Sequence, residues 1–224
     1  MTTLFPLPRF MKSKKDLIRR HYEPLVRPGA SHHEMLDWGS REAQLARFRV
    51  LAERLKAEGL FTTNRPPSLL DVGCGITDLK TFLDTEGLSV DYTGVDITPA
   101  ILDQARTKHP DRKIIQADVF KDPPFPAAAF DVVFCSGTLN LKLGNNAVFA
   151  AEALAAMRKL AGKLLVVNFL HQRTRKKFSQ CHYYSPDTIR ETARRVAAPF
   201  LDLAVIDDYL ENDFTLAIRI NGDA

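Results

Sequence analysis

The stretch LLDVGCGITDLK, residues 69–80, decides the fold. A short apolar run ends in a loop that contains Gly73 and Gly75, and charged residues that suit a helix follow. Two glycines at this spacing allow a tight turn with no side chain in the way, so the backbone can closely approach a bound molecule. The stretch therefore predicts a strand, a ligand-binding loop and a helix, in that order.

Apolar runs and helical patterns alternate through the rest of the chain. The expected strands are residues 68–72, 91–96, 113–117, 130–137 and 163–170, and the expected helices are residues 78–87, 98–109, 145–160 and 185–196. Two late runs, 200–210 and 213–220, are separated by a few polar residues and predict an antiparallel hairpin. This pattern predicts an α/β fold, a Rossmann-like, doubly wound and mostly parallel sheet of about seven strands.

The N-terminal part of the chain has a different character. Two prolines precede the first expected strand, which suggests an N-terminal helical extension over residues 1–60, packed on a domain of residues 61–224. Ser13, with Asp16 three residues later, is expected to begin a short helix, and Ser40 a longer one that ends near Gly59.

Composition sets outer limits on location and partners. The chain has 224 residues, of which 45% are hydrophobic, and no apolar run approaches the roughly 20 residues of a membrane span. Its three cysteines form no pair or CxxC spacing, and His32 and His33 lack companions at metal-ligand spacing. We therefore expect a cytoplasmic protein with reduced thiols, no metal and no membrane association. The net charge of +4 neither requires nor excludes a nucleic acid.

The acids around the glycine loop restrict the ligand. A dinucleotide fingerprint would place a glycine at position 78, but the chain has Asp78 there, at a helix N-terminus, where its carboxylate would repel a pyrophosphate. Asp71 adds a second carboxylate two residues before the first glycine. These charges favour a cationic ligand without phosphate, and S-adenosylmethionine has that chemistry.

Two further acids follow strand ends. Asp96 closes the expected second strand about 20 residues past the turn, where a carboxylate can bind both ribose hydroxyls. Asp118 follows the third strand and can accept a hydrogen bond from an adenine amino group. Ile97 and Val119 offer apolar contacts to the two ring faces.

The segments LLDVGCGITD, YTGVDIT, QADVF and FDVVFCSGTLN occur in an order that resembles the class I S-adenosylmethionine-dependent methyltransferases. The resemblance covers roughly residues 40–220 and implies methyl transfer with S-adenosylmethionine as cofactor. Its implied cofactor-binding residues are Asp71, Gly73, Cys74, Gly75, Asp78, Asp96, Ile97, Asp118, Val119 and Cys135. Residues 135–137 would form the floor beside the methyl group, with the cysteines as small residues rather than nucleophiles. Many members have a third glycine where this chain has Thr77, which we expect to cap the following helix.

The acceptor is expected to be a small molecule. Residues 135–140, CSGTLN, do not resemble the Asn-Pro-Pro-Tyr motif of enzymes that methylate amino groups of bases and glutamine, and they hold no acid for a magnesium site. This leaves an oxygen, carbon or nitrogen acceptor, with oxygen or carbon favoured. If a general base is needed, His171 and Tyr184 are the candidates, although both can equally be packing residues.

The N-terminal extension is expected to cover the substrate. Tyr22 and Trp38 are the candidates for contact with cofactor or acceptor, and packing is the alternative for Trp38. Two other functions remain open on the sequence. A nicotinamide-dependent oxidoreductase is disfavoured by Asp78, and a nucleic-acid-modifying methyltransferase would use basic segments such as RTRKK, residues 173–177.

Overall fold

The computed structural model describes residues 13–27, 29–37 and 39–220, apart from the side chain of His33. A seven-stranded sheet forms its centre, in the order β3-β2-β1-β4-β5-β7-β6. The strands are β1 (Ser68–Val72), β2 (Asp91–Asp96), β3 (Ile114–Gln116), β4 (Phe130–Cys135), β5 (Ala161–Leu170), β6 (Asp202–Ile206) and β7 (Asp213–Arg219). The helices are α1 (Lys14–Tyr22), the 3-10 helix η1 (Glu23–Leu25), α2 (His32–Met35), α3 (Arg41–Ala57), α4 (Asp78–Thr85), α5 (Pro99–Lys108), α6 (Asn146–Leu160) and α7 (Pro186–Val196).

The strand directions confirm the predicted architecture. β1 pairs in parallel with β2 and β4, and β2–β3 and β4–β5 are also parallel. β7 runs antiparallel to both of its neighbours, β5 and β6, so the predicted C-terminal hairpin is confirmed. The strand order reverses at β1, since β2 lies on one side of it and β4 on the other. In such sheets ligands bind outside the carboxyl ends of the strands at this reversal.

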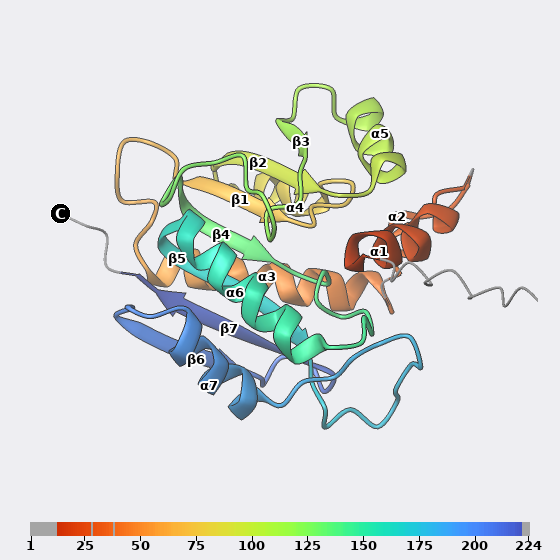
Figure 1. Ribbon diagram of the computed structural model, residues 1–224. Coiled ribbons are helices and arrows are strands. Elements are labelled where there is room, and N and C mark those ends of the chain that lie inside the picture. Colours follow the sequence, from red (N-terminus) through yellow and green to blue (C-terminus); the bar gives the residue numbers. More distant parts are fainter. Residues whose placement is uncertain (1–12, 28, 38, 221–224) are drawn as a thin grey trace, which may run out of the picture.

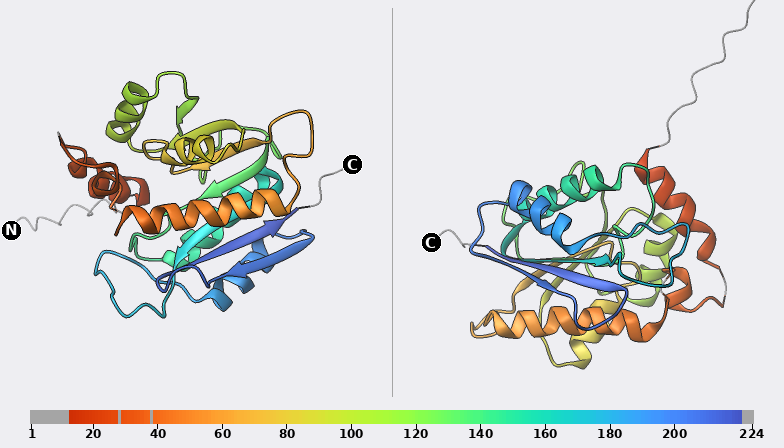
Figure 2. Two further views of the ribbon diagram at one scale, coloured as in Figure 1. Left: turned by 180° about the vertical axis from the view of Figure 1, so that it is seen from behind. Right: turned by 90° about the horizontal axis from the view of Figure 1, so that it is seen from below.

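Helices cover both faces of the sheet (Figure 2), as nearly continuous apolar strands require. Leu70 and Val133 face the cluster that includes α6 and α7, whereas Leu69 and Val132 face the cluster that includes α3 and α4. Neighbouring residues in a strand point to opposite faces, so each strand contributes to both clusters. None of the helices in the described part of the chain has the length and apolar character that a membrane span needs.

The N-terminal elements begin at the caps that the sequence predicts. Ser13 forms a capping box with Asp16, and the Ser40 hydroxyl accepts a hydrogen bond from the N–H of Ala43. The structure adds η1 and α2, which the sequence analysis did not predict. α3 packs on the sheet, whereas α1 and α2 lie beyond the carboxyl ends of β1 and β4 (Figure 1).

Candidate functional site

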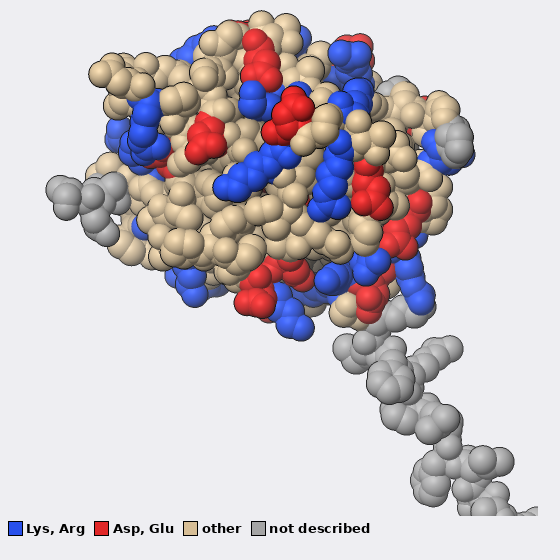
Figure 3. Space-filling view, turned by 90° about the horizontal axis from the view of Figure 1, so that it is seen from above, with Lys and Arg blue, Asp and Glu red and all other residues tan. Residues whose placement is uncertain are grey.

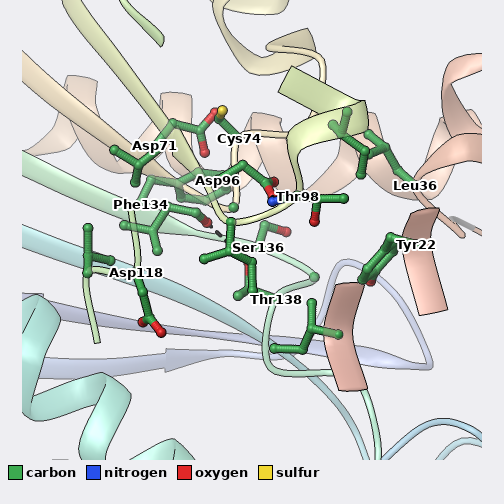
Figure 4. Close-up of a pocket in the computed structure, with 18 of the residues that line it drawn as sticks. Tyr22, Leu36, Asp71, Cys74, Asp96, Thr98, Asp118, Phe134, Ser136 and Thr138 are labelled. Atoms are coloured by element: carbon green, nitrogen blue, oxygen red, sulfur yellow. Dashed lines mark hydrogen bonds between the residues drawn. The ribbon is translucent and has the colours of Figure 1, made fainter. Parts of the chain in front are cut away.

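A cavity lies at the strand-order reversal. It holds about 1050 Å³ of space, including the part open to solvent. Four predicted acids line it, namely Asp71, Asp78, Asp96 and Asp118. In Figure 4, Asp118 and Tyr22 lie at opposite sides of the cavity with Asp96 between them. The structure therefore brings together carboxylates that follow three different strands.

The glycine loop has the close contacts that exclude larger residues. Gly73 and Gly75 have φ angles of +75° and +54°, which L side chains rarely adopt. A Cβ atom on Gly73 would lie 2.0 Å from Oγ1 of Thr138, and one on Gly75 would lie 2.8 Å from Cδ2 of Leu36. Gly73 lines the cavity, whereas Gly75 makes room for the N-terminal Leu36 to pack on the loop.

Thr77 does not cap the following helix as predicted. Its φ of 64° and ψ of 32° are left-handed, and its side chain makes no capping hydrogen bond. The buried hydroxyl instead donates to the carbonyl oxygen of Ile76 at 2.7 Å and accepts from Arg112. The left-handed backbone explains why a glycine suits this position, and Arg112 helps to hold threonine there.

Asp71 is a buried residue of the cavity wall. Its side chain accepts a hydrogen bond of 2.7 Å from the hydroxyl of Tyr92 on β2. Burial raises the pKa of Asp71 to about 7, the nearby charges of Asp96 and Asp78 act in the same direction, and the Tyr92 hydrogen bond opposes them. A bound cation would favour the ionised form of this carboxyl. The contact between Tyr92 and Asp71 could have been predicted from the sequence only if the register of β1 and β2 were known.

The two oxygens of Asp96 are oriented by the backbone. Oδ2 accepts from the N–H of Gly75 at 3.2 Å, and Oδ1 accepts from the N–H of Thr98 at 2.8 Å. Thr98, the residue before α5, makes no capping hydrogen bond from its own side chain. Burial raises the pKa of Asp96, and these hydrogen bonds oppose the increase. Carboxylate oxygens can accept further hydrogen bonds from a ligand.

Asp78 connects the loop to the N-terminal elements. Its Oδ1 lies 2.7 Å from Nδ1 of His32, and its Oδ2 accepts from Nε2 of Gln44 at 3.2 Å. His32 belongs to α2 and Gln44 to α3. The carboxylate therefore lines the cavity and also joins the glycine loop to α2 and α3.

The remaining predicted residues divide into two groups. Ile97, Val119 and Cys74 line the cavity, as does Asp118. Cys135 is fully buried in the core and is not in the cavity lining, which continues instead through Ser136 and Gly137. Burial raises the pKa of Cys74 and Cys135, as expected of packing residues rather than nucleophiles.

The N-terminal elements contribute side chains to the cavity wall. Tyr22 and Leu36 line it, together with Lys14 and Ile18 of α1. Trp38 lies outside the described residues. The sequence analysis missed Leu36, Gln44 and Thr138, because their positions follow from packing between distant segments and no short motif marks them.

Neither of the two candidate bases, His171 and Tyr184, is among the residues that line the cavity. The hydroxyl of Tyr184 donates to the carbonyl oxygen of Leu139 at 2.9 Å, and its ring packs against Phe169. Nδ1 of His171 accepts from the N–H of Arg173 at 3.0 Å. These contacts hold both side chains within the segment after β5, and neither side chain lines the cavity.

Comparison with known proteins supports the sequence motifs. Residues 69–163 match a family model described as a methyltransferase domain. A trans-aconitate 2-methyltransferase of Enterobacter sp. (strain 638) is 35% identical over 100 residues, which cover 44% of this chain and 37% of that protein. An 18S rRNA (guanine-N(7))-methyltransferase of Bos taurus is 34% identical over 68 residues, 30% of this chain and 24% of that protein. The chain thus matches well under half the length of each of these relatives.

Solved structures share the fold over nearly the whole chain. A magnesium protoporphyrin IX methyltransferase from Synechocystis PCC 6803 with bound SAM superposes with a TM-score of 0.66 at 12% identity, covering 96% of this chain and all of that one. The [4+2]-cyclase SpnF has a TM-score of 0.65 at 14% identity, covering 94% of this chain and 97% of that one. Since a cyclase shares it, the fold alone does not establish the reaction. Residues 69–163 are thus similar to a methyltransferase domain, and the chain shares its fold with solved S-adenosylmethionine-dependent methyltransferases.

Proposed function

We propose that the protein transfers a methyl group from S-adenosylmethionine to a small molecule. The observation that carries this proposal is the acid-lined cavity at the strand-order reversal, within the segment that matches the methyltransferase family. Fold likeness supports it, but the positions of Asp71, Asp96 and Asp118 supply the chemistry.

The cavity residues fit this cofactor from end to end. Asp96 presents oriented carboxylate oxygens to ribose hydroxyls, and Asp118 and Val119 line the cavity at the end suited to adenine. Asp71 places a buried carboxyl near Gly73, where a cationic amino acid end can approach the backbone. When bound, S-adenosylmethionine supplies an activated methyl group, so the protein mainly has to hold the acceptor in line at close distance.

The N-terminal segment acts as a cover. Residues 13–37 place Tyr22 and Leu36 in the cavity wall, and His32 holds the segment to Asp78 at 2.7 Å. A cover of this kind excludes water and fixes the acceptor. We retain the division into an N-terminal extension, residues 1–60, and a catalytic domain, residues 61–224, as part of this proposal.

A small-molecule acceptor is favoured over a nucleic acid. On the face shown in Figure 3, Lys and Arg side chains are mixed with Asp and Glu, whereas a nucleic-acid site favours one positive surface. The trans-aconitate relative is named for a small acceptor, and the rRNA relative represents the other possibility. We also propose a cytoplasmic location, supported by Cys74, Cys135 and Cys181, which are all free thiols.

Calorimetry with S-adenosylhomocysteine tests the cofactor assignment. The wild-type protein should bind this compound and should not bind NAD. Asp96→Asn should weaken binding about 10- to 100-fold, because the charged acceptor for the ribose hydroxyls is lost. Asp91→Asn, at the exposed start of the same strand, is the control and should bind like wild type.

Two results would contradict the proposal. Tight binding of NAD with no heat from S-adenosylhomocysteine would reject the cofactor. Equal affinities for wild type and Asp96→Asn would reject the assigned binding mode.

A further inference from the structure

A second cavity adjoins the first and opens beside the cover. It holds about 620 Å³, again including space open to solvent. Its apolar wall comes from Leu36, Leu141, Leu170 and Phe178, which belong to four separate segments. Phe178 is 47% exposed, so an aromatic surface stands at the mouth of the cavity.

Tyr22 stands between the two cavities. Tyr22, Leu36 and Gly137 line both of them. Burial raises the pKa of Tyr22, and so do the charges of Asp37 on the second-cavity side and Asp96 on the first-cavity side. Its side chain is therefore close to carboxylates of both cavities. A molecule in the second cavity would meet the first cavity at this junction.

Asp37 places a carboxylate in the wall of the second cavity. Its Oδ2 lies 2.9 Å from Nε2 of His21, whose ring packs edge-on against Tyr22 at 4.9 Å between centroids. The φ of Asp37 is +52°, an uncommon conformation for a residue with a side chain. Strained backbone of this kind often accompanies functional side chains, and His21 gives this carboxylate a fixed orientation.

Asn140 adds a hydrogen-bond acceptor to the second cavity. Oδ1 of Asn140 is buried and has no hydrogen-bond partner among the described residues. Arg47 contributes positive charge to the lining, but its guanidinium contacts Asp213 at 2.7 Å. A ligand whose inner end donates hydrogen bonds would satisfy Asn140 and Asp37, whereas a carboxylate beside Asp37 would be repelled.

We infer that the second cavity binds the methyl acceptor through a hydroxyl or amine, and that Asp37, oriented by His21, receives the proton of that group. This inference rests on the proposed function. As the oxygen or nitrogen forms its bond to the methyl carbon, the carbon–sulfur bond breaks and its electron pair stays on sulfur. The acceptor proton passes to a carboxylate oxygen of Asp37, which balances the transfer. The apolar wall holds the remainder of the acceptor, and Lys176 at the cavity edge accommodates an acidic group distant from Asp37.

Cys181 provides a readout that does not depend on turnover. This half-buried thiol lines the second cavity, whereas Cys74 and Cys135 are buried. The rate at which a maleimide labels Cys181 is measured with S-adenosylhomocysteine bound, with and without a probe. The probes are 4-methylphenol and 4-methylbenzoate, which share an aromatic body and differ in the group offered to Asp37.

In the wild type, 4-methylphenol should slow labelling about threefold at twice its dissociation constant. At least a tenfold higher concentration of 4-methylbenzoate should be needed for the same protection, since its carboxylate and that of Asp37 repel each other. Asp37→Asn should remove this preference, and Asn suits the left-handed backbone. Asp84→Asn, an exposed aspartate on α4, is the matched control and should keep the preference.

Transfer of labelled methyl to phenols and amines gives the catalytic readout. For an acceptor found in this way, Asp37→Asn should lower kcat about 100-fold or more, as expected when a general base is lost. Its affinity for S-adenosylhomocysteine should stay within about twofold of wild type, because Asp37 does not line the first cavity.

The outcomes separate this inference from the proposed function. Equal or better protection by 4-methylbenzoate, protection by neither probe, or wild-type kcat in Asp37→Asn would overturn the inference while cofactor binding stood. Failure of the wild type to bind S-adenosylhomocysteine would instead reject the proposed function.

Discussion

The two cavities are built in different ways. The first takes its acids from the ends of successive parallel strands, so Asp71, Asp96 and Asp118 follow regular sequence landmarks. The second is assembled from the cover, the end of β5 and the segment after it, and Asp37 lies far in sequence from Phe178. Binding of a common cofactor thus depends on local motifs, whereas binding of the acceptor depends on contacts between distant segments.

The largest effect on stability is expected from breaking a buried ion pair beside the second cavity. Arg47 of α3 contacts Asp213 of β7 at 2.7 Å, with side chains 4% and 0% exposed. Arg47→Met should reduce the free energy of unfolding by about 3–5 kcal/mol, because it leaves Asp213 buried without this partner. Urea unfolding measures the loss, and Arg49→Met on the exposed side of the same helix is the control.

The double variant Arg47→Met with Asp213→Leu sharpens this test. It should recover most of the lost stability, because neither charge is then buried. If the free energy of unfolding of the single variant fell by less than about 1 kcal/mol, the ion pair would contribute little to the stability of the structure around the second cavity.

A substitution of Gly73 tests the first cavity through the free energy of unfolding. Gly73→Ala should cost about 2–3 kcal/mol, since its Cβ would lie 2.0 Å from Oγ1 of Thr138 and its φ is +75°. Adding Thr138→Ala should restore part of the stability by removing the collision but not the backbone strain. Thermal unfolding measures both, and a Gly73→Ala protein as stable as wild type would contradict the close contact.

The sequence predicted the strands, the principal helices and the acids of the first cavity because each has a local signal. Asp96 follows a strand at a known spacing from the glycines, and Ser13 and Ser40 begin helices through capping patterns. Tyr92, His32 and Asn140 had no such signal. Their roles depend on strand register and on which distant segments pack together. His171 and Tyr184 were selected because they follow the fifth strand at the ligand-binding edge, and neither lines the first cavity.

The affinity of the first cavity for its cofactor should depend on pH, because Asp71 ionises in the neutral range. Its pKa of about 7 is raised, so the free protein carries a neutral carboxyl at low pH and a buried charge at high pH. The stability of the free protein should therefore fall as pH rises from the usual aspartate range through 7. The affinity for the cationic cofactor should rise about tenfold between pH 6 and 8, following the ionised fraction.

Adenosine, which lacks the amino acid end and its ammonium, provides the control for this measurement. Its affinity should depend less on pH than that of S-adenosylmethionine. Tyr92→Phe removes the hydrogen bond that lowers the pKa of Asp71, so the midpoint should move to higher pH. Identical pH profiles for the two compounds would show that Asp71 does not sense the cationic ligand.

Thr77 gives the smallest expected effect and tests how far a local motif can vary. Its left-handed backbone favours glycine, but its hydroxyl bonds to Ile76 and Arg112. Thr77→Gly gains about 1 kcal/mol from the backbone and loses a similar amount from the hydrogen bonds, so the net change should be below about 1 kcal/mol. Thr77→Ala loses the hydrogen bonds and keeps the strained backbone, so it should be about 1 kcal/mol less stable than Thr77→Gly. If urea unfolding ranked Thr77→Ala above Thr77→Gly, backbone strain would not explain the preference for glycine, and packing around Arg112 would have to.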